Sequence, residues 1–328
     1  MSDGERSCRA DLPRIEAVSD LVFLAGHLQP RTVIIPGGDR EDDLRLVESA
    51  RDHGIVERCI LVGDERAIRR AAGDVGIAVN DRDILPTATQ EETAERTVEA
   101  VAGGGIDLIL KGNISTPLLN RAIMQIRVRS TISLVTMFDA ACIGNGRPML
   151  LTDPGVTTDC TFERMVDLVE NAVDVARSIM GLDRPRVAIL SANEKQIKSL
   201  PSTQMGLDLA RHGWAHASVY GPLSFDLAVS EESVRLKQDS LSDAAREVAG
   251  RADILVCPCL DSANILYKVI MEIVKYGLGT FAGVTVGVSV PYVILSRADN
   301  LETKLQSIAL SSMASEYMKM ERPGASGS

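Results

Sequence analysis

The sequence has no apolar run of the roughly 18 residues that a membrane-spanning helix needs. Residues 1–14 also lack the apolar core of a signal peptide, so we expect a soluble, cytoplasmic protein. Positive charge is scarce: 35 Lys and Arg face 45 Asp and Glu, which gives a net charge of −10. We therefore expect no nucleic-acid or membrane partner, because both would need a basic face.

Metal-binding and disulfide patterns are missing as well. Four histidines are scattered without an HExxH or paired-carboxylate spacing, so no metal site is expected: His27, His53, His212 and His216. Six cysteines form no disulfide framework: Cys8, Cys59, Cys142, Cys160, Cys257 and Cys259. Cys257-Pro258-Cys259 is one residue too short for a CxxC motif. We interpret the cysteines as buried, small apolar side chains of a reduced protein.

The chain does contain short β-branched runs that alternate with longer helical patterns. This alternation is typical of βαβ units and predicts an α/β fold with mainly parallel sheets. Strands are expected at 32–36, 59–62, 108–111, 132–137, 149–152, 187–191, 254–257 and 292–295. Helices are expected at 42–53, 91–102, 116–126, 161–180, 204–211, 242–249, 263–275 and 300–320.

The length of 328 residues favours two domains or one large α/β domain. Asp153-Pro154-Gly155 and the stretch 277–291 have the composition of hinges. We predict a discontinuous domain I of residues 1–150 plus 288–320, and a domain II of residues 151–287. Residues 321–328, rich in Gly, Ser and Pro, are expected to be a disordered tail.

The first candidate site follows the predicted strand 108–111. Lys111, Gly112 and Asn113 come at its carboxyl end, and Ser115 and Thr116 begin the next helix. An ammonium group, an amide, two hydroxyls and free backbone N–H groups suit a phosphate or a thioester carbonyl. The alternative is that Ser115 or Thr116 caps the helix and Lys111 points into water. The two interpretations are compatible.

Arg121 follows about one and a half helical turns after Thr116, so its side chain could turn back toward this first candidate site. A second candidate site, Ser296, Arg297 and Asp299, follows the predicted strand 292–295. It combines a hydroxyl, a bidentate oxyanion ligand and a carboxylate. The alternative is an Asp299 helix cap with an exposed Arg297.

A third and weaker cluster is the segment 221–226. Asp226 could orient a basic group or act as a base, and an ordinary turn aspartate fits the pattern equally well. Gly37-Gly38-Asp39 has neither GxGxxG nor Walker spacing, so we interpret it as a strand-to-helix turn.

These segments resemble the phosphate butyryl-/acetyltransferase family, from about residue 30 to 320. The most specific match is Ser296-Arg297-Ala298-Asp299 with the residues 302–305 and 307–310. Gly221-Pro222-Leu223 with Asp226, and the segment 264–268, add to it. The residues of these segments are more similar to the butyryl branch of the family than to the acetyl branch.

The resemblance implies a phosphate acyltransferase that moves a short acyl group reversibly between acyl-CoA and inorganic phosphate. It also implies two α/β domains of the isocitrate/isopropylmalate dehydrogenase type and a cleft that takes coenzyme A as substrate. A homodimer with no tightly bound cofactor completes the expectation.

By position, Ser296 and Arg297 match the family's serine–arginine pair, and Arg121 matches an arginine that holds phosphate. A carboxylate is implied to remove the thiol proton of coenzyme A. The acetyl branch has this aspartate seven residues after the serine, where the present chain has Thr303. Asp299, Glu302 and Asp226 are therefore the candidate bases, and Asp299 is our assignment. The expected substrate-binding residues are Lys111, Gly112, Asn113, Ser115, Thr116, Arg121 and Asp226.

Two other functions compete with acyl transfer. A dehydrogenase of the same fold would need a dinucleotide site and metal ligands that the sequence does not display. A catalytically impaired acyl-CoA-binding relative would have kept the cleft and lost the base, as the threonine at position 303 suggests.

Overall fold

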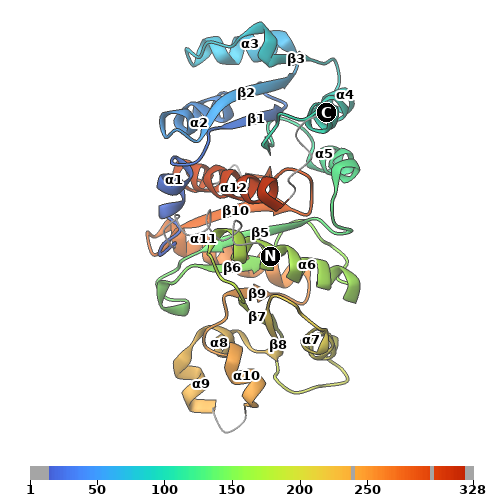
Figure 1. Ribbon diagram of the computed structural model, residues 1–328, viewed down its shortest axis with the longest axis vertical. Helices are drawn as coiled ribbons and strands as arrows, with labels where there is room; N and C mark the ends of the chain where they lie inside the picture. The colour runs from blue at the N-terminus through green and yellow to red at the C-terminus, as the bar shows by residue number, and fades with distance from the viewer. Residues whose placement is uncertain (1–14, 238–240, 296–298, 322–328) are drawn as a thin grey trace.

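An eleven-stranded sheet runs the length of the molecule (Figure 1), in the order β3-β2-β1-β4-β11-β10-β5-β6-β9-β7-β8. This computed structural model describes residues 15–237, 241–295 and 299–321. Neighbouring strands are parallel except for β11–β10, β10–β5 and β5–β6 in the middle. The strands are β1 (Arg31–Pro36), β2 (Val56–Gly63), β3 (Ile84–Pro86), β4 (Leu108–Leu110), β5 (Ser133–Phe138), β6 (Met149–Thr152), β7 (Arg186–Leu190), β8 (Ser218–Leu223), β9 (Ile254–Val256), β10 (Phe281–Val286) and β11 (Tyr292–Val293).

Helices cover both faces of the sheet. One continuous apolar core joins the sheet to α1 (Asp20–Ala25), α2 (Glu41–Asp52), α3 (Glu65–Asp74), α6 (Phe162–Ile179), α7 (Pro201–Arg211) and α12 (Leu301–Glu321). On the opposite face, α4 (Gln90–Ala102) and α5 (Thr116–Ile123) share a core with β1, β4 and β11. A separate core there holds α8 (Phe225–Val229), α10 (Asp243–Val248) and α11 (Leu260–Lys275), with α9 (Glu231–Lys237) at its margin. The predicted α/β fold with a mainly parallel sheet is confirmed.

Each strand predicted from a β-branched run is present, because such runs are buried on both faces, as in the fully buried β1. The prediction that 277–291 is a hinge is wrong, since β10 lies within it. Glycines at 277, 279, 283 and 287 interrupt the apolar pattern, and only pairing with β5 and β11 makes the segment a strand.

The chain returns to its first half near its end. Tyr292 and Val293 of β11 pair in parallel with Ile109 and Leu110 of β4. The following helix, α12, packs on α1, α2 and β10. The segment 288–320 thus contacts elements of the first half of the chain. The division into two domains stays a prediction. Of the predicted tail 321–328, Glu321 belongs to α12, which corrects the start of the tail, and residues 322–328 lie outside the described residues.

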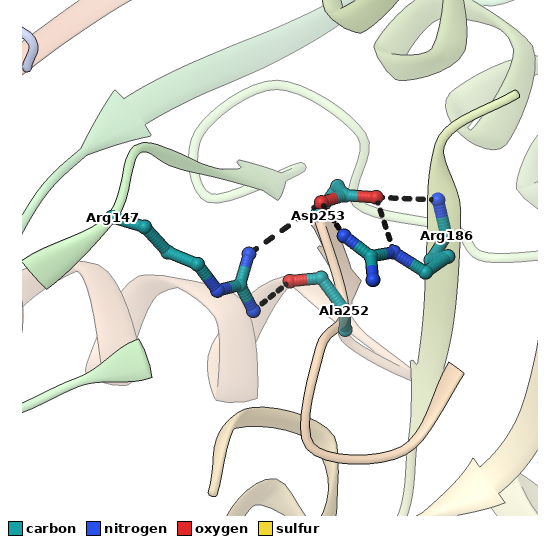
Figure 2. A network of polar contacts seen from close by, with 4 residues as sticks. All are labelled: Arg147, Arg186, Ala252 and Asp253. Atoms are coloured by element: carbon teal, nitrogen blue, oxygen red, sulfur yellow. Dashed lines mark hydrogen bonds and ion pairs between the residues drawn. The ribbon is translucent and has the colours of Figure 1, made fainter. Parts of the chain in front are cut away.

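One buried carboxylate links three strands of the second half (Figure 2). Asp253, just before β9, is 5% exposed and accepts two hydrogen bonds of 2.9 Å from the Arg186 guanidinium at the start of β7. Arg147, just before β6, lies 3.5 Å from the same carboxylate and donates to the Ala252 carbonyl at 2.7 Å. The order β6-β9-β7 is therefore fixed by charge as well as by strand pairing.

We expect Asp253→Asn to lower the free energy of unfolding by about 3 kcal/mol, because it leaves two half-buried guanidinium groups without their anion. Asp243→Asn is a matched control: this carboxylate is fully exposed and pairs with Arg246 on the surface, so its loss should change the stability much less than that of Asp253. Urea denaturation measures both. Equal, small changes in the two variants would contradict the prediction.

Candidate active site

The loops that follow β1 and β4 are packed directly against each other. A Cβ atom at Gly37 would lie 2.4 Å from the Asn113 backbone, and one at Gly112 would lie 2.3 Å from the Gly37 carbonyl oxygen. Only glycine fits at either position. The left-handed φ of +71° at Gly37 supports the interpretation of residues 37–39 as a strand-to-helix turn.

This close packing uses the backbone N–H groups that were expected to be free. Gly112 donates to Pro36 at 3.1 Å, Asn113 donates to Gly37 at 2.7 Å, and Ser115 donates to the Gln90 side chain at 3.1 Å. The expectation of free N–H groups at these positions is therefore wrong. These three N–H groups are therefore not available to an anion.

The side chains of the first candidate site lie on one loop. Lys111 is half-buried, and its Nζ donates to the Gly112 carbonyl at 3.2 Å. The Asn113 amide donates to Asp39 at 3.3 Å. Ser115 occupies the N-cap position of α5, yet its hydroxyl makes no capping hydrogen bond. The capping alternative is thus wrong for Ser115.

Arg121 lies in the last turn of α5 and is exposed. At about 1.5 Å of helix rise per residue, its Cα is about 7.5 Å along the axis from that of Thr116. Five residues also turn the helix by about 140°, so Arg121 and Thr116 lie on different faces of α5, and the approach of Arg121 to the Lys111 loop stays a prediction.

Ser296 and Arg297 lie outside the described residues. The strand that leads to them is well defined, because Lys111 donates its N–H to the Val293 carbonyl at 3.0 Å. Parallel strands deliver their carboxyl ends to the same edge of a sheet. The chain therefore enters the second candidate segment from a position beside Lys111.

Asp299 is half-buried and is not the cap of α12. Asn300 caps this helix, since its side-chain oxygen accepts from the Thr303 N–H at 2.8 Å. The alternative interpretation of Asp299 as the cap is therefore wrong. Burial raises the pKa of the Tyr267 phenol on α11 to about 12, and the nearby Asp299 charge adds to the rise. The charge of Asp299 thus acts on a residue of α11.

The other two candidate bases differ in position. Glu302 is exposed in the first turn of α12. Asp226 follows β8. Five strands lie between β8 and β11, so six inter-strand spacings of about 4.8 Å put the two strands about 29 Å apart. Its pKa is lowered by a hydrogen bond from Ser224 and by Lys237, whose Nζ lies 3.2 Å away. The structure does not bring Asp226 to the other candidate residues.

Sequence reasoning missed a carboxyl group at the Lys111 edge. Asp43 in α2 is 6% exposed, with Arg40 as an ion-pair partner at 3.8 Å. Burial raises its pKa, while Arg40, Lys304 and Lys111 act in the opposite direction. A hollow of about 490 Å³ lined by Asp39 and Arg40 opens beside it. The acidic run 41–43 resembles an ordinary helix start, so the only sequence signal was a charge on the apolar stripe of α2.

The cysteines only partly meet the expectation. Cys59 and Cys257 are buried, and burial raises the pKa of both thiols to about 12. Cys142 and Cys259 are exposed, so the interpretation of these two as buried is wrong. Over the described ranges, no three His, Cys, Asp or Glu side chains come together as a possible metal site, and no helix is long and apolar enough to cross a membrane.

Comparison with known proteins identifies the family. The model of the phosphate acetyl/butaryl transferase family matches residues 88–312. The phosphate butyryltransferase of Clostridium acetobutylicum is 32% identical over 91% of this chain and 98% of its own. The phosphate acetyltransferase of Thermotoga maritima is 33% identical over 77% of this chain and 85% of its own.

A solved structure agrees with these sequence matches. A branched-chain phosphotransacylase from Enterococcus faecalis superposes with a TM-score of 0.71 at 29% identity, over 87% of this chain and 99% of its own. The chain belongs to the phosphate acetyl/butaryl transferase family, and the prediction of a phosphate acyltransferase is confirmed.

The structure assigns the helix cap to Asn300, whereas the sequence left Asp299 as a candidate for both the cap and the catalytic base. Asn300→Ala should lower the free energy of unfolding by about 1 kcal/mol with little effect on turnover, because it removes a helix cap. Asp299→Asn should leave stability almost unchanged and remove most of the rate from acyl phosphate to coenzyme A if Asp299 is the base. Thermal unfolding and initial rates measure the two effects. Normal turnover in Asp299→Asn would move the base to another carboxylate.

Proposed function

We propose that the chain transfers a short acyl group reversibly between coenzyme A and inorganic phosphate at the carboxyl ends of β4 and β11. The observation that carries this proposal is the pairing of the two strands, which brings Lys111 beside the segment leading to Ser296 and Arg297. Arg40 and Lys304 add positive charge near the same edge, as their effect on Asp43 indicates. A dianionic phosphate needs such local charge in a protein of net charge −10.

The proposed reaction is a direct transfer. Asp299 removes the thiol proton of coenzyme A, and the thiolate attacks the carbonyl carbon of the acyl phosphate. The carbon–sulfur bond forms, the carbon–oxygen bond to phosphate breaks, and inorganic phosphate leaves. Ser296 and Arg297 donate to the oxyanion, each such donor contributing roughly 3–4 kcal/mol. Lys111 and Arg121 hold the phosphate.

One observation favours the impaired acyl-CoA-binding alternative. Thr303 is 3% exposed and packs in the first turn of α12, so this position supplies no acid to the site. The discriminating assay measures release of coenzyme A from butyryl-CoA in the presence of phosphate. Release supports the proposed reaction, whereas binding of butyryl-CoA without release supports the alternative. Operation without metal or tightly bound cofactor, and a cytoplasmic location, stay predictions from the sequence.

Arg297→Lys should reduce both phosphate affinity and turnover, because a single ammonium cannot reproduce the planar two-donor fork of a guanidinium. Ser296→Ala should lower kcat by about 100-fold while the KM for phosphate changes little, if the hydroxyl acts mainly in the transition state. Steady-state kinetics in both directions measure these effects. Arg297→Lys with wild-type kinetics would remove Arg297 from the site.

We also propose a homodimer that forms through α11. Ile265 and Val269 on this helix are 66% and 50% exposed, and Tyr276 directly after it is 80% exposed. Their spacings of four and seven residues place them on one face. Leu278 nearby is 51% exposed. An apolar patch of this kind on a soluble protein is typical of an interaction surface, and a second copy of the chain presents the same patch.

Val269→Lys should convert the dimer to a monomer, because it puts a charge into the centre of the proposed apolar contact. Leu236→Lys is the matched control: Leu236 is 81% exposed on a different helix, α9, and its replacement should leave the dimer intact. Light scattering after size exclusion gives the masses. A wild-type monomer at micromolar concentration would contradict the proposal.

A further inference from the structure

The middle of the sheet is incompletely covered on one face. The core that contains α5 includes Tyr292 of β11, and the core that contains α11 includes Phe281 of β10. Between them, Gly283 of β10 and Leu134 of β5 are half-buried. Central strands of a doubly covered sheet are ordinarily buried on both faces. The incomplete burial of these two residues therefore indicates an opening between the two helix groups.

Three apolar side chains surround Gly283 on that face. A Cβ atom built on Gly283 would lie 3.5 Å from Leu134 Cδ1, 3.7 Å from Thr136 Cγ2 and 3.9 Å from Phe281 Cε1. These are ordinary van der Waals distances, so a small side chain fits without a clash. On the other side of the strand, the Gly283 N–H donates to Ser307 Oγ of α12 at 3.0 Å. The strand is thus held by its backbone, while its missing side chain leaves room above the sheet.

This opening adjoins the candidate active site. Thr285 of β10 pairs with Tyr292 of β11, so Gly283 lies on the strand next to the one that leads to Ser296 in the chain. On the other flank, the Phe281 ring lies 5.3 Å from the Tyr267 ring. Tyr267 is the residue whose phenol senses the charge of Asp299. The opening therefore lies between β11, the strand that leads to the second candidate segment, and Tyr267 of α11.

We propose that Gly283 is the floor of the subsite for the acyl chain of acyl-CoA, with Leu134, Phe281 and the Thr136 methyl group as its walls. This inference rests on the proposed acyl transfer and adds the residue that sets chain length. An apolar lining suits an alkyl chain, and a glycine floor gives it the depth of one additional small side chain. Filling that depth penalises butyryl more than acetyl.

The test compares kcat/KM for butyryl-CoA and acetyl-CoA in the wild type, Gly283→Ala and Gly283→Val. We expect the butyryl-to-acetyl ratio to fall about 10-fold or more in Gly283→Val and less in Gly283→Ala, because one methylene in an apolar pocket is worth roughly 10–200-fold. The acetyl-CoA value should stay within about threefold of wild type. Gly73→Ala is the control, since a Cβ at this exposed position of α3 meets nothing within 4 Å.

Leu134→Ala tests the same subsite in the opposite direction. It enlarges the opening, so the ratio of hexanoyl-CoA to butyryl-CoA should rise, and it keeps the test decisive if Gly283→Val does not fold. Unchanged ratios in Gly283→Ala and Leu134→Ala, in active enzyme, would overturn the acyl subsite alone. A wild type that releases coenzyme A from none of these thioesters would overturn the proposed function, and the subsite with it.

Discussion

The hydrogen-bonded pairing of β11 with β4 on one side and β10 on the other is the contact on which the rest of the structure depends. It is the point at which a parallel half-sheet meets the antiparallel centre of the molecule. The pairing brings Val293 beside Lys111, although 182 residues of chain separate them. Without it, neither the candidate catalytic segment nor the long helix α12 would reach the edge where α2 and α5 begin.

The sheet edge at the carboxyl ends of β1 and β4 differs from a phosphate-binding loop whose backbone N–H groups are free, because the N–H groups of Gly112 and Asn113 are hydrogen-bonded. The glycines at 37 and 112 let two loops come into contact, and this contact consumes the amides of Gly112 and Asn113. These two amides are therefore not available to an anion, and charged side chains such as Lys111 become more important for its recognition. Asp43 is buried near these groups, and the charges of Arg40, Lys304 and Lys111 oppose the rise in its pKa that burial causes. A protein with an acidic surface can thus concentrate basic groups at one edge of its sheet.

At the start of α12, residues that stabilise the helix lie next to the residue proposed as the catalytic base. Asn300 caps the helix, and Thr303 is buried in its first turn. Asp299 is not the cap residue, and its charge contributes to the raised pKa of Tyr267 on α11, a helix of the other half of the sheet. This arrangement provides a physical reason for choosing Asp299 over Asp226, which lies beyond five further strands and is already paired with Lys237.

The sequence alone determined most of the strands and helices, because β-branched runs and helical spacings reflect burial that each segment requires locally. It also determined the family, since the segment around Ser296 and Arg297 carries specific residues. It could not reveal β10, whose glycines weaken its local preference until β5 and β11 pair with it. Hydrogen bonds to the amides of 112–115, the cap at Asn300 and the burial of Asp43 were equally invisible. These features depend on groups far apart in the chain, so only the tertiary structure decided them.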